Sequence, residues 1–267
     1  MRPVSVAIDA AHAAGEHILR HFGQALEIQT KGPDDYVTQV DVAAEAMIVR
    51  TIRSAYPHDA FWGEETHVPG TDAQRVWVID PLDGTRNYTV GLPFFCISIA
   101  LWVADRPVLG VVYDPLRAET FHAVAGEGSY LNGARIRFVP KHRLDGAIVY
   151  IGFLPAQNPD DPGLSLPIYG RLRPSVAAMR NIGSAALSLA YIASGRIDIA
   201  CHDRLQAWDM LAGALLIEES GGVATDFQGY PLTLSSRDII AASSEALHAA
   251  VLRVAQSVTG EPGATAH

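Results

Sequence analysis

Two unlike stretches of secondary-structure pattern follow one another in this chain, and their order constrains the fold more than any other feature. In the first stretch, apolar positions recur every three or four residues over 4–22 and 40–55, which predicts two amphipathic helices. Short apolar runs bounded by turn residues come next, and a Gly-rich stretch at 126–133 is interpreted as turns. The first stretch therefore predicts two helices and then an antiparallel sheet, with strands at 76–80, 94–103, 107–113 and 119–123.

The second stretch alternates strands with helices, which is typical of an α/β unit. It begins near residue 147 and contains a loop rich in Pro and Asp at 155–167. No flexible linker precedes it, and the 267 residues correspond to roughly two domains of about 150 residues. We therefore expect an α+β half at 1–142 and an α/β half at 143–267 that share one interface. The predicted strands are 147–151, 197–201, 223–227 and 239–242, the predicted helices are 184–193, 208–220 and 244–254, and residues 259–264 are expected to be frayed.

Composition and charge exclude several classes of protein. Hydrophobic residues make up 49% of the chain and charged residues 18%, which indicates a globular protein with a sizeable core. The formal net charge of −9 has the wrong sign for holding nucleic acid or an anionic membrane by bulk charge. Two cysteines, Cys96 and Cys201, are too few for a disulfide framework or a zinc cage. The longest apolar run, 92–104, is too short to span a bilayer and no signal sequence is recognised, so a cytoplasmic location is expected.

The most informative motif is Asp-Pro-Leu-Asp-Gly-Thr at residues 80–85, directly after a predicted strand. The strand delivers Asp80, Pro81 is expected to end its hydrogen bonding, and the turn returns Asp83 to the same side. Two adjacent buried carboxylates raise each other's pKa, and a divalent cation keeps both ionised. The Leu82 carbonyl adds a hard oxygen of the kind that Mg²⁺ prefers. A purely structural turn with two Asp caps is the alternative interpretation.

Other acidic residues lie at the ends of further predicted elements. Glu64 follows a short apolar run, and Asp209 begins a predicted helix, where the helix dipole also favours an acid. Thr38 and Asp41 precede an apolar helical run in the pattern of a capping box. Each of these acids has a structural interpretation by itself, as a solvated turn or a helix start. Their combination with the motif at 80–85 indicates a metal site.

These segments, in their order along the chain, resemble the inositol monophosphatase family of Mg²⁺-dependent, lithium-sensitive phosphatases. The resemblance extends from about residue 7 to residue 247 and implies an α/β fold, the αβαβα layered sandwich. It also implies lithium inhibition and, as in many relatives, a homodimer. The matching segments are 35–41, 63–65, 80–85, 110–113, 183–186, 208–209 and 221–222.

The resemblance further implies how a phosphate monoester would be hydrolysed. Two Mg²⁺ ions about 3.5–4 Å apart activate a water molecule and neutralise the leaving oxygen. The Thr85 hydroxyl and Glu64 would orient that water, and Asp41 would lie beside an additional metal or its water. The implied metal ligands are Glu64, Asp80, the Leu82 carbonyl, Asp83 and Asp209.

The implied substrate site departs from the family pattern at one position. Relatives that act on inositol phosphates carry Glu seven residues before the Asp209 position, where this chain has His202 followed by Asp203. A neutral imidazole has one donor and one acceptor, so it cannot accept hydrogen bonds from two ring hydroxyls. Replacement of that Glu by Asp203 after a small shift is a hypothesis. The substrate-binding residues that the resemblance implies are Gly84 and Thr85, through N–H groups to the phosphate, and Gly183, Ser184, Ala185, His202 and Asp209.

Together these features predict a Mg²⁺-dependent phosphomonoesterase for a small polyol phosphate, nominally inositol 1-phosphate. Histidinol-phosphate phosphatase, and then 3′(2′),5′-bisphosphate nucleotidase or fructose-1,6-bisphosphatase, are alternatives because the same metal core serves different substrates. A catalytically silent binding or regulatory module is an alternative of another class, and it predicts the loss of a metal ligand. The expected partners are a small phosphate monoester and a second copy of the chain, without nucleic acid or membrane.

Overall fold

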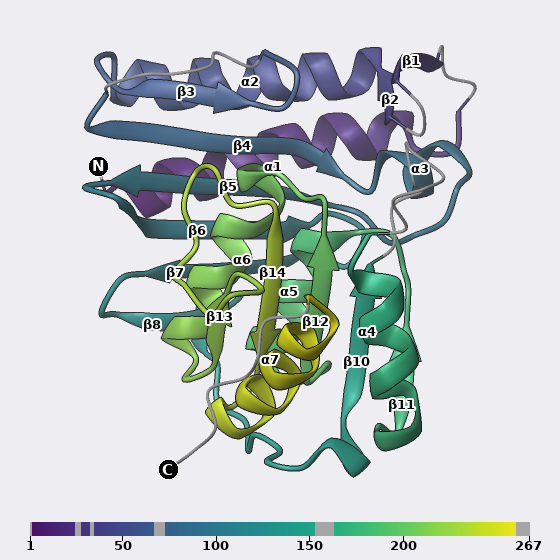
Figure 1. Cartoon of the computed structure of the whole chain (residues 1–267). Coiled ribbons are helices and arrows are strands. Elements are labelled where there is room, and N and C mark those ends of the chain that lie inside the picture. The colour runs from purple at the N-terminus through teal and green to yellow at the C-terminus, as the bar shows by residue number, and fades with distance from the viewer. Residues whose placement is uncertain (1, 25–27, 33–34, 67–72, 153–162, 260–267) are drawn as a thin grey trace.

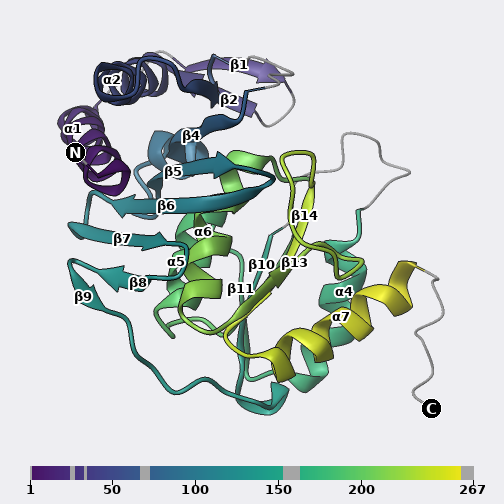
Figure 2. The same ribbon diagram turned by 90° about the vertical axis from the view of Figure 1, so that its left-hand side faces the viewer.

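Helices and sheets alternate in five layers. The computed structural model describes residues 2–24, 28–32, 35–66, 73–152 and 163–259. A helix pair covers one face of a large sheet, a second pair lies between that sheet and a smaller one, and a third pair covers the far face (Figures 1 and 2). This order confirms the predicted αβαβα sandwich. The three pairs are α1 (Pro3–His21) with α2 (Gln39–Ala55), α5 (Ala185–Ala193) with α6 (Ala207–Glu219), and α4 (Ser165–Leu172) with α7 (Glu245–Thr259).

The large sheet has seven strands in the order of the sequence. All neighbouring strands are antiparallel, as expected, except the first pair, which is parallel. That first strand was not predicted, because it is only four residues long and lies at the sheet edge. The strands are β3 (Ala60–Gly63), β4 (Arg75–Asp83), β5 (Cys96–Val103), β6 (Arg106–Asp114), β7 (Glu119–Val124), β8 (Gly128–Leu131) and β9 (Ala134–Arg135).

Strand β4 continues past Pro81, contrary to the expectation that this residue ends the strand's hydrogen bonding. Asp80 pairs with Ser98 and Asp83 pairs with Cys96, with an irregularity in the register between the two pairs. A proline cannot donate to a neighbouring strand, so it is tolerated at such a bulge. The bulge accounts for two acids three residues apart reaching the same place.

The small sheet has five strands in the order β11-β10-β12-β14-β13. Its first three strands are parallel and the remaining pairs are antiparallel. A separate two-stranded antiparallel sheet precedes α2. The small-sheet strands are β10 (Ile148–Gly152), β11 (Ala178–Arg180), β12 (Ile199–Asp203), β13 (Val223–Thr225) and β14 (Asp238–Ala242), and the separate pair is β1 (Ile28–Gly32) and β2 (Asp35–Thr38).

Helix α6 lies at the centre of the molecule (Figure 2). Residues 210–217 are all buried, which is the pattern of a helix covered on every side. One core cluster joins Val78 of the large sheet, Leu211 of α6 and Ala241 of the small sheet. The two sheets thus share a core through the central helices. The boundary expected at 142/143 lies between the last strand of the large sheet and β10, and the division into two halves stays a prediction.

Two further differences from the predictions concern β8 and α4. Strand β8 lies inside the stretch interpreted as turns, where Gly126 and Gly128 have positive φ values and border a short hairpin strand. Helix α4 begins inside the predicted 155–167 loop, and its start is fixed by Asp203 from β12, a contact that local sequence does not reveal.

Residues 153–162 and 260–267 lie outside the described residues. Within the described residues, no helix is both long and apolar enough to cross a membrane. The short helices are α3 (Thr85–Thr89) and the 3₁₀ turns Leu144–Gly146 and Arg173–Ser175.

Candidate active site

Three carboxylates from distant parts of the chain meet at one point. Asp80 and Asp83 lie at the end of β4, and Asp209 lies in the first turn of α6. One oxygen atom from each carboxylate lies within 4.8 Å of the other two, and both β4 acids are buried. The N–H of Leu82 donates to Asp80 Oδ1 at 2.9 Å, so one of the two Asp caps of the alternative interpretation is present, whereas Asp83 accepts from Ser184 and Ala186 instead. The turn and the acidic cluster are two properties of the same segment.

Burial and mutual repulsion raise the pKa values in this cluster. For Asp80, burial is the largest cause and the charges of Glu64 and Asp83 come next, so its pKa lies well above the usual carboxyl range. Burial, followed by the charge of Asp83, raises the pKa of Asp209 to about 7. A divalent cation offsets this cost because it is attracted to the ionised form of each acid. A cluster of hard oxygen donors therefore fits a cation such as Mg²⁺.

Asp83 is held by the N-terminal end of α5. Its Oδ2 accepts hydrogen bonds from Ser184 Oγ at 2.5 Å and from the N–H of Ala186 at 2.8 Å, and its Oδ1 lies 3.3 Å from the N–H of Ala185. Burial raises the pKa of Asp83, and these hydrogen bonds oppose that rise. The donors of Ser184 and Ala185 are thus directed at Asp83, and substrate binding by Gly183, Ser184 and Ala185 stays a prediction.

Asp41 caps a helix and also contacts the turn after β4. In the predicted capping box, Thr38 Oγ1 accepts from the N–H of Val40 at 3.1 Å, and Asp41 Oδ2 accepts from the N–H of Thr38 at 3.0 Å. The other carboxylate oxygen, Oδ1, lies 3.0 Å from Thr85 Oγ1. That hydroxyl also lies 2.9 Å from the Leu82 carbonyl, and its single proton can go to only one of the two acceptors at a time.

Glu64 approaches the cluster from a third element. It follows β3, and its N–H donates to the Ile79 carbonyl of β4 at 3.1 Å. Its carboxylate is close enough to Asp80 to raise the pKa of that residue. The structure thus brings four of the predicted acids together, namely Glu64, Asp80, Asp83 and Asp209.

Gly84 gives the turn after β4 its shape. Its φ of +97° is left-handed, and a Cβ at this position would lie 3.0 Å from the Phe94 carbonyl oxygen and 3.2 Å from that of Gly183. Glycine fits because both the conformation and the space exclude a side chain. Next to it, the buried Asn87 donates from Nδ2 to the carbonyls of Phe94 and Ile182, each at 2.7 Å. This side chain, which the sequence did not single out, joins the turn to the segment before α5.

His202 is buried on β12, with 6% of its surface exposed. Its Nδ1 lies 2.7 Å from the Asp203 carbonyl oxygen, which can only accept, so Nδ1 carries the proton and Nε2 is the acceptor nitrogen. Burial lowers the pKa of His202, which keeps the ring neutral at pH 7. A Cβ at Gly152 on the neighbouring strand would lie 1.6 Å from the ring, so the imidazole covers the Gly152 backbone.

The hypothesis that Asp203 replaces the family's Glu is wrong. Its Oδ2 accepts from the N–H of Leu164 at 2.5 Å, and its Oδ1 accepts from Ser165 Oγ at 2.7 Å. The carboxylate therefore satisfies the start of α4, where helix N–H groups need an acceptor.

Glu45 is a second buried polar residue that the sequence did not single out. It lies on α2 and accepts a hydrogen bond from the N–H of Glu65, next to Glu64. Its spacing of four residues from Asp41 on a predicted helix was the available signal, because such residues share a helix face.

Comparison with known proteins agrees with this architecture. A sequence model of the inositol monophosphatase family matches residues 2–259. The chain is 44% identical over 251 residues to Nus factor SuhB from Haemophilus influenzae, which covers 92% of this chain and 94% of the relative. The structure of extragenic suppressor protein suhB from Bartonella henselae superposes with a TM-score of 0.88 at 37% identity, covering 94% of this chain and 97% of that one. The Thermotoga maritima IMPase gives a TM-score of 0.87 at 32% identity, covering 98% and 99%. The chain therefore belongs to the inositol monophosphatase family.

Proposed function

We propose that this protein is a Mg²⁺-dependent phosphomonoesterase that hydrolyses a small polyol phosphate. The observation that carries the proposal is that carboxylate oxygens of Asp80, Asp83 and Asp209 lie within 4.8 Å of one another. They lie next to the turn after β4, in which the Thr85 hydroxyl contacts the Leu82 carbonyl. The residues that would hold the metal are Glu64, Asp80, the Leu82 carbonyl, Asp83 and Asp209. When bound there, Mg²⁺ would supply positive charge for the phosphate oxygens and lower the pKa of a nearby water.

The chain's own groups would orient the phosphate and the attacking water. The backbone N–H groups of Gly84 and Thr85 are assigned to the phosphate, since the left-handed Gly84 exposes backbone rather than a side chain there. When Thr85 Oγ1 donates to Asp41 Oδ1, its lone pairs can accept from a water. Glu64, whose carboxylate interacts with Asp80, would be a second acceptor for that water. These groups would fix the water's direction before the phosphorus–oxygen bond breaks.

Inositol 1-phosphate is the nominal substrate, and His202 is the reason to test others. One acceptor nitrogen replaces the carboxylate that relatives present to the ring hydroxyls, so a substrate with fewer hydroxyls at this position fits equally well. Histidinol phosphate is therefore the first alternative. Adenosine 3′,5′-bisphosphate and fructose 1,6-bisphosphate follow it. Lithium inhibition and a homodimer are further proposals that rest on the family.

A binding function without catalysis is the second candidate. Its support is the name of a relative, Nus factor SuhB, at 44% identity. On this alternative the acidic cluster would have no catalytic role. The two candidates differ in whether phosphate release depends on the cluster.

Phosphate release from the four substrates, with and without Mg²⁺, tests the proposal. We expect one substrate to be hydrolysed well with Mg²⁺, and we expect Asp83→Asn and Asp209→Asn to lose at least about a hundredfold in kcat/KM. Asp226→Asn is the control, because Asp226 caps a surface turn through the N–H groups of Gln228 and Tyr230. Parent-like rates in both cluster variants would show that the metal site is wrong. Equally poor rates on all four substrates with the parent protein would favour the binding function.

A further inference from the structure

Helix α2 presents two buried acids to the site, one helical turn apart. Asp41 and Glu45 are both fully buried, and residues four positions apart lie on the same helix face. Asp41 reaches the turn after β4 through Thr85. Glu45 reaches the turn after β3, the segment that carries Glu64. One face of one helix therefore contacts two of the segments that form the acidic cluster.

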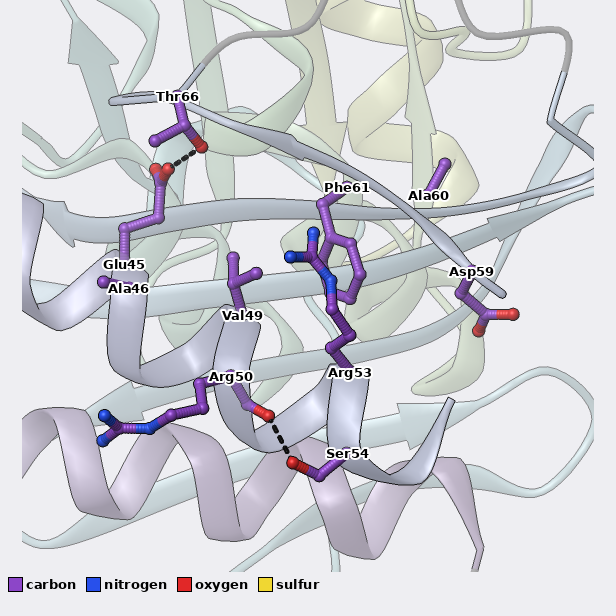
Figure 3. A pocket seen from close by; sticks show the side chains of 10 residues that line it. All are labelled: Glu45, Ala46, Val49, Arg50, Arg53, Ser54, Asp59, Ala60, Phe61 and Thr66. Carbon is purple, nitrogen blue, oxygen red and sulfur yellow. Dashed lines mark hydrogen bonds between the residues drawn. The ribbon is translucent and has the colours of Figure 1, made fainter. Parts of the chain in front are cut away.

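The carboxylate of Glu45 binds the turn after β3 with both oxygens. Oε2 accepts from the N–H of Glu65 at 2.8 Å, and Oε1 accepts from the hydroxyl of Thr66. Figure 3 shows Glu45 and Thr66 pointing toward each other across the space between α2 and the turn. A buried carboxylate is tolerated when such hydrogen bonds replace its hydration.

Gly63 shows how closely this carboxylate lies against the chain. A Cβ at Gly63 would lie 2.3–2.4 Å from three atoms of the Glu45 carboxyl group. On its other side Gly63 pairs with Ile79, and the next N–H, that of Glu64, donates to the Ile79 carbonyl at 3.1 Å. The backbone that delivers Glu64 is thus held between the Glu45 carboxylate and strand β4.

We propose that Glu45 is a positioning residue that fixes residues 63–66 so that the Glu64 carboxylate faces Asp80 and a metal bound there. The inference rests on the metal-binding role proposed above for Glu64. Partners behind metal ligands orient those ligands, and their removal weakens metal binding by about ten- to a hundredfold.

The space beside this contact makes the proposal testable by truncation. A cavity of about 800 Å³ lies between α2 and β3, lined among others by Glu45, Val49, Phe61 and Thr66 (Figure 3). Water can enter it and solvate the N–H of Glu65 after Glu45→Ala, so the variant is expected to fold. Glu45→Gln retains one acceptor oxygen for Glu65 and an amide that can donate to the Thr66 hydroxyl oxygen.

Calorimetric titration of Mg²⁺ into the 267-residue protein, without substrate, is the test. Glu64→Gln and Glu45→Ala should each weaken binding by about tenfold or more, and Glu45→Gln should restore most of the affinity. Asp59→Ala is the matched control. It removes a carboxylate that borders the same cavity and bonds Arg75 and Trp77 at the other end of β3, so it should lower stability and leave Mg²⁺ affinity unchanged.

A steric pair of variants tests the contact independently. Gly63→Ala should weaken Mg²⁺ binding in the parent, because the new methyl group meets the Glu45 carboxyl, and should cause little further loss in the Glu45→Ala background. Unchanged affinity in Glu64→Gln would refute the metal role of Glu64 and this inference with it. Weakened binding in Glu64→Gln with parent-like binding in Glu45→Ala and Gly63→Ala would overturn the positioning role alone. If Glu45→Ala fails to fold, Gly63→Ala decides between these results.

Discussion

The Ser184 hydroxyl donates a hydrogen bond to Asp83 across 101 residues of sequence, with 2.5 Å between Oγ and Oδ2. Ser184 precedes α5 in the second part of the chain, whereas Asp83 ends β4 of the large sheet. Asp83 also accepts backbone N–H groups from the first turn of α5. The direction of this proposed ligand therefore depends on how the central helix layer packs against the large sheet.

Ser184→Ala should weaken Mg²⁺ binding by about tenfold, because Asp83 loses one of the donors that orient it. Calorimetric titration with Mg²⁺ measures the change. Ser188→Ala is the control, since it removes a buried hydroxyl one turn along α5 that donates to the Ser184 carbonyl instead. Equal losses in the two variants would contradict a specific role for the bond to Asp83.

Gly84→Ala should reduce phosphatase activity more than it reduces stability. A left-handed non-glycine residue costs about 1–2 kcal/mol, and here the Cβ also meets two backbone carbonyls. Gly91→Ala separates these effects, because Gly91 has a φ of +75° with nothing within 4 Å of a Cβ. Urea unfolding and kcat/KM of both variants give the comparison, and parent-like kcat/KM in Gly84→Ala would exclude a role for this turn in phosphate binding.

His202→Glu should raise the rate on inositol 1-phosphate relative to histidinol phosphate by about tenfold, because a carboxylate accepts from two hydroxyls and the neutral imidazole from one. The ratio of the two kcat/KM values is the measurement. His202→Gln serves as the control, since it supplies a single acceptor oxygen without the charge. An unchanged ratio in His202→Glu would place the inositol ring elsewhere.

His248 should make stability fall as the pH drops below about 6.5, the usual pKa of histidine in an unfolded chain. Burial lowers its pKa in the folded state, and Nε2 lies 2.8 Å from Thr225 Oγ1. The unfolded chain therefore takes up a proton first, and the folded state loses stability between that pH and the lowered pKa. Above this range both states are neutral and the contribution is constant.

Urea unfolding of the parent and of His248→Gln, from about pH 8 to about pH 5, isolates this effect. Glutamine can still donate to Thr225 but does not titrate. The stability difference between the two proteins should be constant above about pH 7 and should shift against the parent below it. A difference independent of pH would show that His248 keeps an ordinary pKa in the folded protein.

Features that depend on neighbours in the chain could be predicted from the sequence. The spacing of apolar residues located α1 and α2 to within one residue at each end, and the Thr38–Asp41 pattern predicted a capping box that is present. The proximity of Asp80 to Asp83 followed from a turn of known chemistry. These inferences need only the local periodicity and the local hydrogen bonds.

Features that depend on packing between elements could not be predicted in this way. The hydrogen bond from the Leu164 N–H to Asp203 at the start of α4 could be predicted only if the position of β12 relative to that helix were known. Strand β3 forms because it pairs with β4, and its four residues are too few to show the periodicity that would predict a strand. The proximity of Asp209 to Asp80 could be predicted only from the family resemblance, since no local signal in the sequence relates α6 to β4.

The two capping boxes found among the described residues each use an acid of the candidate site. Asp41 closes the box of α2 with Thr38, and Asp209 closes that of α6 with Gln206, whose N–H donates to Asp209 Oδ2 at 2.7 Å. Losing such a cap costs a protein about 1 kcal/mol, so natural selection for folding alone would retain both acids in a descendant that no longer catalyses anything. Their presence in a genome sequence is therefore weak evidence for an enzyme. Glu64, which lies on no helix and closes no capping box, is the better position at which to test whether a member of the family is a phosphatase.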